Sequence, residues 1–175
     1  MTAHFDHGAS SAKRWMSCPR SISHMKSNPL PDTKDSTLGT ERHTLVEDMW
    51  LKPDTLEEWD YDADDWNNAV TYSEIIKDCV KQVGEGAIVV IEQQFSMEIH
   101  GEKVGGTPDC IVYKQDGELH TIDFKGGFED VDIISNEQLL TYDQAACIEL
   151  EIRPTAVYHH IYQPNSLGTD WKSIE

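Results

Sequence analysis

The sequence lacks the features that identify membrane, secreted and zinc-ribbon proteins. Its 175 residues contain no run of about 18 apolar residues, so we expect no membrane span. The first ten residues, MTAHFDHGAS, have no apolar signal-peptide core, which predicts a cytoplasmic protein. No C-x-x-C pair is present, and the four cysteines lie far apart, which favours reduced thiols over a zinc ribbon: Cys18, Cys79, Cys110 and Cys147.

Positive charge is also scarce, and it is unevenly distributed. The chain has 32 acidic residues against 14 Lys and Arg, and its net charge is −18. Residues 1–34 form a basic N-terminal arm with five Lys or Arg and two Asp, whereas residues 41–66 hold ten acids and two basic residues. A contact with nucleic acid should therefore use the arm. The length fits one domain, 1–175.

One stretch, GGTPDCIVYKQDGELHTIDFKGG, combines acid, base and turn chemistry. It places Asp109 and Asp123 fourteen positions apart, with Lys125 two residues after the second acid. Two β-rich runs, 110–113 and 119–124, flank a Gln-Asp-Gly turn, which is a strong hairpin signal. The relative position of the two carboxylates therefore depends on how this turn is built.

Two hairpin registers are open, and they predict different chemistry. A two-residue Asp-Gly loop would set Cys110 opposite Asp123. A three-residue loop with Gly117 in the left-handed conformation would set Asp109 opposite Asp123. We favour the second register, in which both acids and Lys125 project from one face, because alternate strand residues share a face.

Two carboxylates held side by side repel each other unless a cation lies between them. Oxygen ligands suit Mg²⁺ or Mn²⁺, and Lys125 could then orient or deprotonate a water beside the metal. The alternative is an ordinary hairpin with exposed aspartates and a solvated lysine. The pattern does not decide between them by itself, so the rest of the chain must.

The basic arm contains an aromatic residue among cations. Pro19 interrupts residues 10–26, so we expect two short helices there. Arg14 and Trp15 lie together in the first of them, and a basic residue beside an aromatic is typical of a surface that binds single strands. Packing of Trp15 against the core is an equally supported alternative.

A helix predicted over 37–51 carries a second candidate site. His43 and Glu47 are one turn apart at the edge of its apolar arc, so both can point into a cleft beside the core. The following acidic segment, 53–68, has no Ca²⁺-loop spacing, which excludes an EF-hand. We interpret it as a solvated acidic loop, with a docking site for a basic partner as the less favoured alternative.

The remaining pattern alternates helices and strands. We expect a helix over 69–83, one long strand over 87–99, a helix over 135–151 and a last strand over 156–162. Gln138 and Tyr142 share a face of the third helix. With the hairpin, this order predicts an α/β fold with a mixed central β-sheet flanked by helices.

Several motifs occur in a fixed order along the chain. Pro108-Asp109 followed by Asp123-Phe124-Lys125 is accompanied by four further segments: Ser-Ala-Lys-Arg-Trp-Met-Ser-Cys-Pro at 11–19, Gly39-Thr40 with His43 and Glu47, Gln138 with Tyr142, and Ile161-Tyr162-Gln163-Pro164. On these residues the chain resembles the PD-(D/E)XK nuclease superfamily, specifically the RecB-like exonucleases of phages and prophages. The resemblance covers roughly residues 10–165.

The resemblance implies a restriction-endonuclease-like core and a role for each matching residue. His43, Asp109 and Asp123 would hold one or two Mg²⁺ or Mn²⁺ ions. Lys125 would position the attacking water, while Gln138 would act beside it in the catalytic group. The other assignments from sequence are substrate contacts by Tyr142, Arg14 and Trp15, and an auxiliary acid at Glu47.

The implied function is metal-dependent hydrolysis of DNA, with exonuclease action in phage recombination, replication or DNA breakdown. Its place would be the host cytoplasm, and its candidate partners are DNA, further copies of the chain and a phage recombination protein. No iron-sulfur cluster is expected, because the C-terminal cysteine triplet of some relatives is missing. The alternative is a catalytically silent nuclease fold or an acidic protein that imitates DNA, which the −18 charge would serve.

Overall fold

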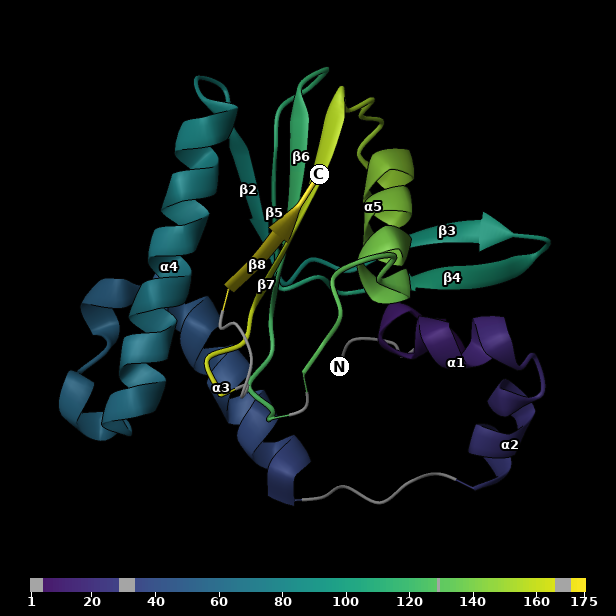
Figure 1. Cartoon of the computed structure of the whole chain (residues 1–175), viewed down its shortest axis with the longest axis horizontal. Coiled ribbons are helices and arrows are strands. Elements are labelled where there is room, and N and C mark those ends of the chain that lie inside the picture. Colours follow the sequence, from purple (N-terminus) through teal and green to yellow (C-terminus); the bar gives the residue numbers. More distant parts are fainter. Residues whose placement is uncertain (1–4, 29–33, 129, 166–170) are drawn as a thin grey trace.

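Two β-sheets organise the computed structural model, which describes residues 5–28, 34–128, 130–165 and 171–175 (Figure 1). The larger sheet has the order β2-β5-β6-β7-β8, with bounds Ile88–Ile91, Cys110–Tyr113, Glu118–Phe124, Ala156–Tyr162 and Trp171–Ile174. It is mixed, because β6 and β7 are parallel and the other neighbours are antiparallel. The predicted α/β class with a mixed central sheet is confirmed.

The smaller sheet has the strand order β1-β4-β3. Strands β3 (Phe95–Ile99) and β4 (Glu102–Gly106) form a hairpin that extends sideways past the larger sheet (Figure 1). Strand β1 (His7–Gly8) pairs in parallel with β4, so the N-terminal arm becomes an edge of this sheet. The arm is thereby attached beside the hairpin, although its residues 1–4 and 29–33 lie outside the described ranges.

Helices cover both faces of the larger sheet. Helices α3 and α4 lie on one side and α5 on the other, with α1 beside the lower end of α5 and α2 next to α1 (Figure 1). Their bounds are α1 Ala12–Ser17, α2 Ser21–Ser27, α3 Lys34–Leu51, α4 Ala63–Val83 and α5 Glu137–Glu149; three short 3₁₀ turns are Ala9–Ser11, Pro53–Thr55 and Glu58–Asp60. In the described part of the chain, no helix has the length and apolar character that a membrane crossing requires.

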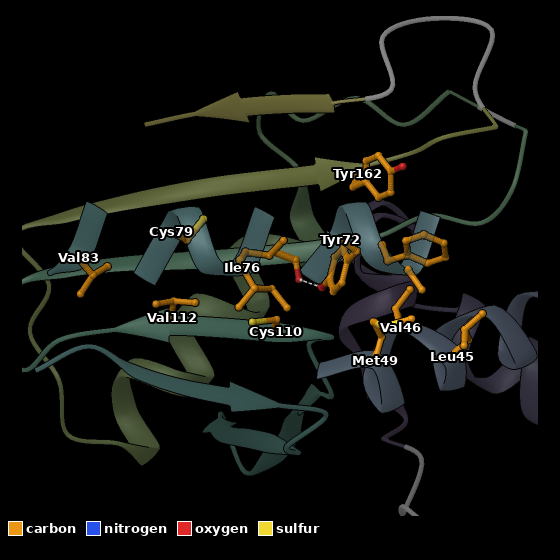
Figure 2. Close-up of a cluster of buried hydrophobic side chains, with 13 residues drawn as sticks. Leu45, Val46, Met49, Tyr72, Ile76, Cys79, Val83, Cys110, Val112 and Tyr162 are labelled. Atoms are coloured by element: carbon orange, nitrogen blue, oxygen red, sulfur yellow. Dashed lines mark hydrogen bonds between the residues drawn. The ribbon is translucent and has the colours of Figure 1, made fainter. Parts of the chain in front are cut away.

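The largest apolar cluster lies between α4, α3 and the sheet (Figure 2). Tyr72 and Ile76 of α4 are fully enclosed there against Cys110 and Ile122 of the sheet. The Tyr72 hydroxyl donates a hydrogen bond to the Ile122 carbonyl at 3.2 Å, so even this polar atom is satisfied. This packing holds β5 and β6 against α4.

The β5–β6 hairpin has the predicted register. Cys110 pairs with Ile122, which sets Asp109 at the position opposite Asp123. The turn is three residues long, but its left-handed residue is Asp116, at φ 55°, and Gly117 is not left-handed. The prediction for Gly117 was therefore wrong: Asp tolerates this conformation, and the Gly117 N–H closes the turn on the Lys114 carbonyl at 3.0 Å.

The predicted single strand over 87–99 is wrong, because the chain leaves one sheet and enters the other within it. Strand β2 pairs with β5 of the larger sheet, and β3 pairs with β4 of the smaller one. Glu92 takes the left-handed conformation between them, at φ 48°, and its N–H donates to the Asp109 carbonyl at 3.2 Å. The change of sheet brings Glu92 beside Asp109.

Three other boundaries follow from local chemistry. Pro19 separates two short helices, as predicted. The predicted helix over 69–83 begins earlier, at Ala63, because the Asp62 side chain accepts hydrogen bonds from the first N–H groups of α4. Residues Trp171–Ile174 form β8, with Trp171 packed against the main cluster.

Candidate active site

The two aspartates open onto one cavity at an end of the larger sheet. Asp109 immediately precedes β5 and Asp123 lies near the end of β6, while α3 brings His43 and α5 brings Gln138 to the same place. The cavity has a volume of about 630 Å³. Seven predicted site residues line it: Arg14, His43, Asp109, Asp123, Lys125, Gln138 and Tyr142.

Asp109 is buried and paired with a histidine. One carboxylate oxygen, Oδ1, lies 3.2 Å from His43 Nδ1, and the other accepts a hydrogen bond from the Phe124 N–H at 2.6 Å. Burial by itself would raise the pKa of Asp109, but His43, Lys125 and this N–H outweigh it and lower the pKa. Burial would likewise lower the pKa of His43, yet the Asp109 charge leaves it raised.

Asp123 forms a second polar group with Lys125 and α5. Lys125 Nζ lies 2.8 Å from Asp123 Oδ2 and donates a hydrogen bond to Gln138 Oε1 at 3.0 Å. Gln138 Nε2 in turn donates to Asp123 Oδ1 at 3.3 Å and to the Tyr142 hydroxyl at 2.9 Å. Burial, with the Asp109 charge, outweighs Lys125 and raises the pKa of Asp123 to about 6.

Glu92 is a site residue that sequence reasoning missed. Its carboxylate can meet His43 and Asp109, since ligand atoms of the three lie within 4.8 Å of one another. Burial, followed by the Asp109 charge, raises the pKa of Glu92 to about 8. The sequence did contain a signal for it, because Glu92 interrupts the apolar run AIVVIEQQF. Burying a charged side chain in such a run costs free energy unless the charge has a partner.

These residues fit a divalent cation. Asp123 Oδ2 is buried and accepts no well-directed hydrogen bond from the described residues, although Lys125 Nζ is near it. Burial also holds the pKa values of Glu92 and Asp123 up, as expected for acids gathered without enough positive charge. Three carboxylates and one imidazole are a ligand set suited to Mg²⁺ or Mn²⁺.

The two predicted residues of the basic arm, Arg14 and Trp15, have different surroundings in the structure. Arg14 lines the cavity and is exposed, with Nη1 3.6 Å from Met25 Sδ. Trp15 is half-buried and does not line the cavity; its indole N–H donates to the Gly8 carbonyl at 2.9 Å and its ring meets His7 edge-on. Its contacts are therefore with the N-terminal segment.

Glu47 lies one turn beyond His43 on α3 and is half-buried. It does not line the cavity, but its negative charge contributes to the raised pKa of Glu92. Arg42, which sequence reasoning did not single out, holds the chain that follows Lys125: Nη1 donates to the Gly126 carbonyl at 2.8 Å, and Nε pairs with Asp65 at 2.7 Å. No short motif indicates such a link between distant segments.

The smaller sheet approaches the cavity closely because it ends in glycine. A Cβ at Gly106 would lie 2.8 Å from the Tyr142 ring and 3.1 Å from Ala9 Cβ. A side chain there would therefore displace Tyr142 and, through it, Gln138. This is the local reason for glycine at the junction of β4 with α5.

Comparison with known proteins identifies a family and a similar fold. The model of the family described as "Protein of unknown function (DUF2800)" matches residues 4–173. None of the curated protein sequences matches the chain. A crystal structure described as "Putative exonuclease", from Eubacterium rectale, has 11% sequence identity and a TM-score of 0.52, over 96% of this chain and 70% of that chain. At this identity the likeness is evidence for the fold alone.

Proposed function

The chain belongs to the DUF2800 family, and we propose that this member is a divalent-cation-dependent nuclease of the PD-(D/E)XK type that hydrolyses phosphodiester bonds in DNA. The observation that carries the proposal is the convergence of Asp109, Asp123, Lys125 and Gln138 on one cavity with His43 beside them. They come from helices α3 and α5, from strand β6, and from the residues just before β5 and just after β6. The likeness in fold to a protein described as "Putative exonuclease" supports a nuclease fold for this proposal.

The acidic residues and His43 would hold the cation. We assign His43, Glu92, Asp109 and Asp123 to one or two Mg²⁺ or Mn²⁺ ions. When bound, such an ion polarises a phosphoryl oxygen and lowers the pKa of a coordinated water. In the protein itself, the Phe124 N–H and the Gln138 amide fix the two aspartates before any ligand arrives.

Lys125 would place a positive charge beside the reacting phosphate. Although burial would lower its pKa, the charges of Asp123 and Asp109 raise it, so the ammonium group remains protonated at neutral pH. In this state it can donate a hydrogen bond to an attacking water and stabilise charge that develops on the phosphate. Gln138 holds the ammonium group in place at 3.0 Å, and Tyr142 supports Gln138.

The exposed cation at the cavity suggests how DNA is held. Arg14 would pair with a backbone phosphate next to the one being hydrolysed. Contacts with phosphates carry no base information, so we expect little sequence preference. We propose exonuclease action in phage recombination, replication or DNA breakdown as the biological setting. Digestion of end-labelled linear DNA in parallel with circular DNA tests the mode, since an exonuclease leaves the circle intact.

Cleavage of DNA by charge-neutralised variants tests the proposed reaction. With Mg²⁺ or Mn²⁺ present, Asp109→Asn and Asp123→Asn should each lower the rate on the order of 10²–10³-fold or more. Asp116→Asn is the matched control, because Asp116 lies in the hairpin turn and Asn also tolerates its left-handed backbone. Equal rates in the wild type and Asp109→Asn would assign any observed cleavage to another site or to a contaminant.

The net charge of −18 supports a second candidate, an acidic protein that imitates DNA. Such a protein has no use for a cation at Asp109. Calorimetric titration with Mn²⁺ separates the two: the nuclease should bind the ion in the wild type and lose binding in Asp109→Asn, whereas the imitator should bind weakly in both.

A further inference from the structure

A second group of metal-binding side chains lies on the α4 face of the larger sheet. Cys79 comes from α4, His120 from β6 and His160 from β7, and their exposed fractions are 3%, 1% and 4%. One ligand atom from each lies within 4.8 Å of the others. Figure 2 shows Cys79 in the layer between α4 and the sheet. Three elements distant in sequence thus bring a thiol and two imidazoles together in the interior.

We propose that Cys79, His120 and His160 bind a transition-metal cation of the Zn²⁺ class, in a site separate from the nuclease centre. Zn²⁺ takes cysteine sulfur and histidine nitrogen as ligands. The nuclease centre has mainly carboxylate ligands and no sulfur. The site goes beyond the proposed reaction, because none of its three residues lines the cavity at Asp109.

The distances are close to those that the ion needs. Cys79 Sγ lies 3.8 Å from His160 Nε2, and His120 Nδ1 lies 2.9 Å from the same nitrogen. Metal bonds of about 2.3 Å to sulfur and 2.0–2.1 Å to nitrogen in a tetrahedron separate S and N by about 3.6 Å and two N atoms by about 3.3 Å. The sulfur is thus nearly in place relative to His160. The two imidazole nitrogens share a direct hydrogen bond between nearly coplanar rings, so an ion must replace its proton, and the rings must turn and separate by about 0.4 Å.

The Glu118 carboxylate contacts the ring nitrogen of His120 that points away from the group. His120 Nε2 lies 3.2 Å from Glu118 Oε2. A metal-bound histidine usually donates its other N–H to such a partner, which fixes the tautomer that points the free nitrogen at the metal. Here the free nitrogen is His120 Nδ1, the atom that faces His160. The arrangement therefore has an outer partner as well as inner ligands.

The ligand atoms of the group contact one another, and within the described part of the chain one outer nitrogen has no partner. Among the described residues, His160 Nδ1 is buried without a hydrogen-bond partner. This nitrogen lies across the ring from Nε2, the atom that faces Cys79 and His120, so in the described ranges His160 lacks the outer partner that Glu118 gives His120. Burial lowers the pKa of both histidines, that of His160 to about 3, so the imidazoles are neutral as ligands must be. Burial raises the pKa of Cys79 to about 12, so binding has to release the thiol proton.

Cobalt spectroscopy of the full, reduced and metal-stripped chain tests the site. Co²⁺ should give the thiolate-to-cobalt charge-transfer band in the near ultraviolet, which the sulfur-free nuclease centre cannot produce. Zn²⁺ should bleach the band by displacement. Cys79→Ser should abolish it, whereas Cys147→Ser should keep it, because Cys147 lies on α5 away from the group. Asp109→Asn should also keep it, which separates this site from the proposed reaction.

A substitution at a partly exposed residue tests the site without changing the core. The Glu118 side chain is 38% exposed, so Glu118→Gln should leave the fold intact while weakening the Co²⁺ affinity about 10- to 100-fold through the loss of its contact with His120. Near-ultraviolet circular dichroism confirms that each variant is folded. A folded wild-type chain that shows no charge-transfer band, or a band that survives Cys79→Ser, overturns the proposal.

Discussion

Strand β6 presents different chemistry to the two helices that cover it. Its residues Ile122 and Phe124 face α4 and belong to an apolar cluster with Tyr72. Thr121 and Asp123, which alternate with them, face α5 and bond to polar side chains of that helix at 2.5 and 3.3 Å. From Thr121 to Phe124, the alternation of the strand thus separates a packing face from a chemical face.

The difference shows how a group of buried acids can be held in place. The α5 face carries charges whose burial costs free energy, and the contacts of Asp123 with Lys125 and Gln138 offset part of that cost. At Ile122 and Phe124 the α4 face supplies apolar burial, which needs no such contacts. Phe124 joins the two, because its ring packs edge-on against Tyr72 while its N–H donates to Asp109. Phe124 therefore takes part both in the apolar packing of one face and in holding a carboxylate of the other.

The largest effect should come from the chemical face. Lys125→Met should lower the rate of DNA cleavage about 10²–10³-fold, because the variant loses the charge that stabilises the transition state. Binding of Mn²⁺ should persist, since Lys125 is not among the assigned ligands. Single-turnover cleavage and calorimetry on the same preparation measure the two quantities.

Lys114→Met provides the matched control for that variant. Lys114 is exposed and lies in the hairpin turn, at the opposite end of β6 from the cavity. Its replacement should leave the cleavage rate within about twofold of the wild type, as expected for a surface change away from the site. If the two variants lose activity equally, the chemical role of Lys125 is wrong and a general effect of charge on DNA binding replaces it.

A large-to-small substitution on the packing face should lower the stability of the protein. Ile122→Ala removes a fully buried side chain and should lower the free energy of unfolding by about 2–5 kcal/mol. For a chain of this size, a loss of about 3 kcal/mol corresponds to a fall in melting temperature of about 6–12 °C. At a temperature where the variant is fully folded, its cleavage rate should be close to that of the wild type. A large loss of rate without a loss of stability would break the distinction between the faces.

The features predicted from sequence were those set by local pattern. Turn length and apolar alternation fixed the β5–β6 register, and with it the facing positions of Asp109 and Asp123. The i, i+4 spacing placed Gln138 beside Tyr142, whose hydroxyl it contacts. The apolar arc of α3 placed His43 at the edge of the core, where it meets Asp109.

The features missed depend on contacts between distant segments. Nothing local shows that β2 and β3 belong to different sheets, so Glu92 was taken for a strand residue rather than a member of the site. The link from Arg42 to the Gly126 carbonyl joins residues 84 positions apart, and no periodicity encodes it. The same is true of β8, whose place is set by pairing with β7 rather than by its own polar sequence.

The smallest predicted effect is a dependence of stability on pH that originates at the cavity. Glu92 has a pKa of about 8 in the folded chain, chiefly through burial, against an ordinary value near 4.5. The folded state therefore binds more protons than the unfolded state across this interval, and stability must fall as pH rises through about 8. In metal-free solution the melting temperature should decline between about pH 7 and 8.5.

The pH window separates Glu92 from the opposing histidines. His120 and His160 have lowered pKa values, so their protonation destabilises the fold only around and below the ordinary histidine pKa of about 6.5. Above pH 7 their contribution is constant, whereas that of Glu92 still changes. Glu92→Gln should flatten the decline, and saturating Mn²⁺ should flatten it in the wild type, because the ion binds the deprotonated carboxylate. Identical slopes in Glu92→Gln and the wild type would assign the decline to His43, whose raised pKa gives a loss of stability in the same direction, and would remove Glu92 from the cation site.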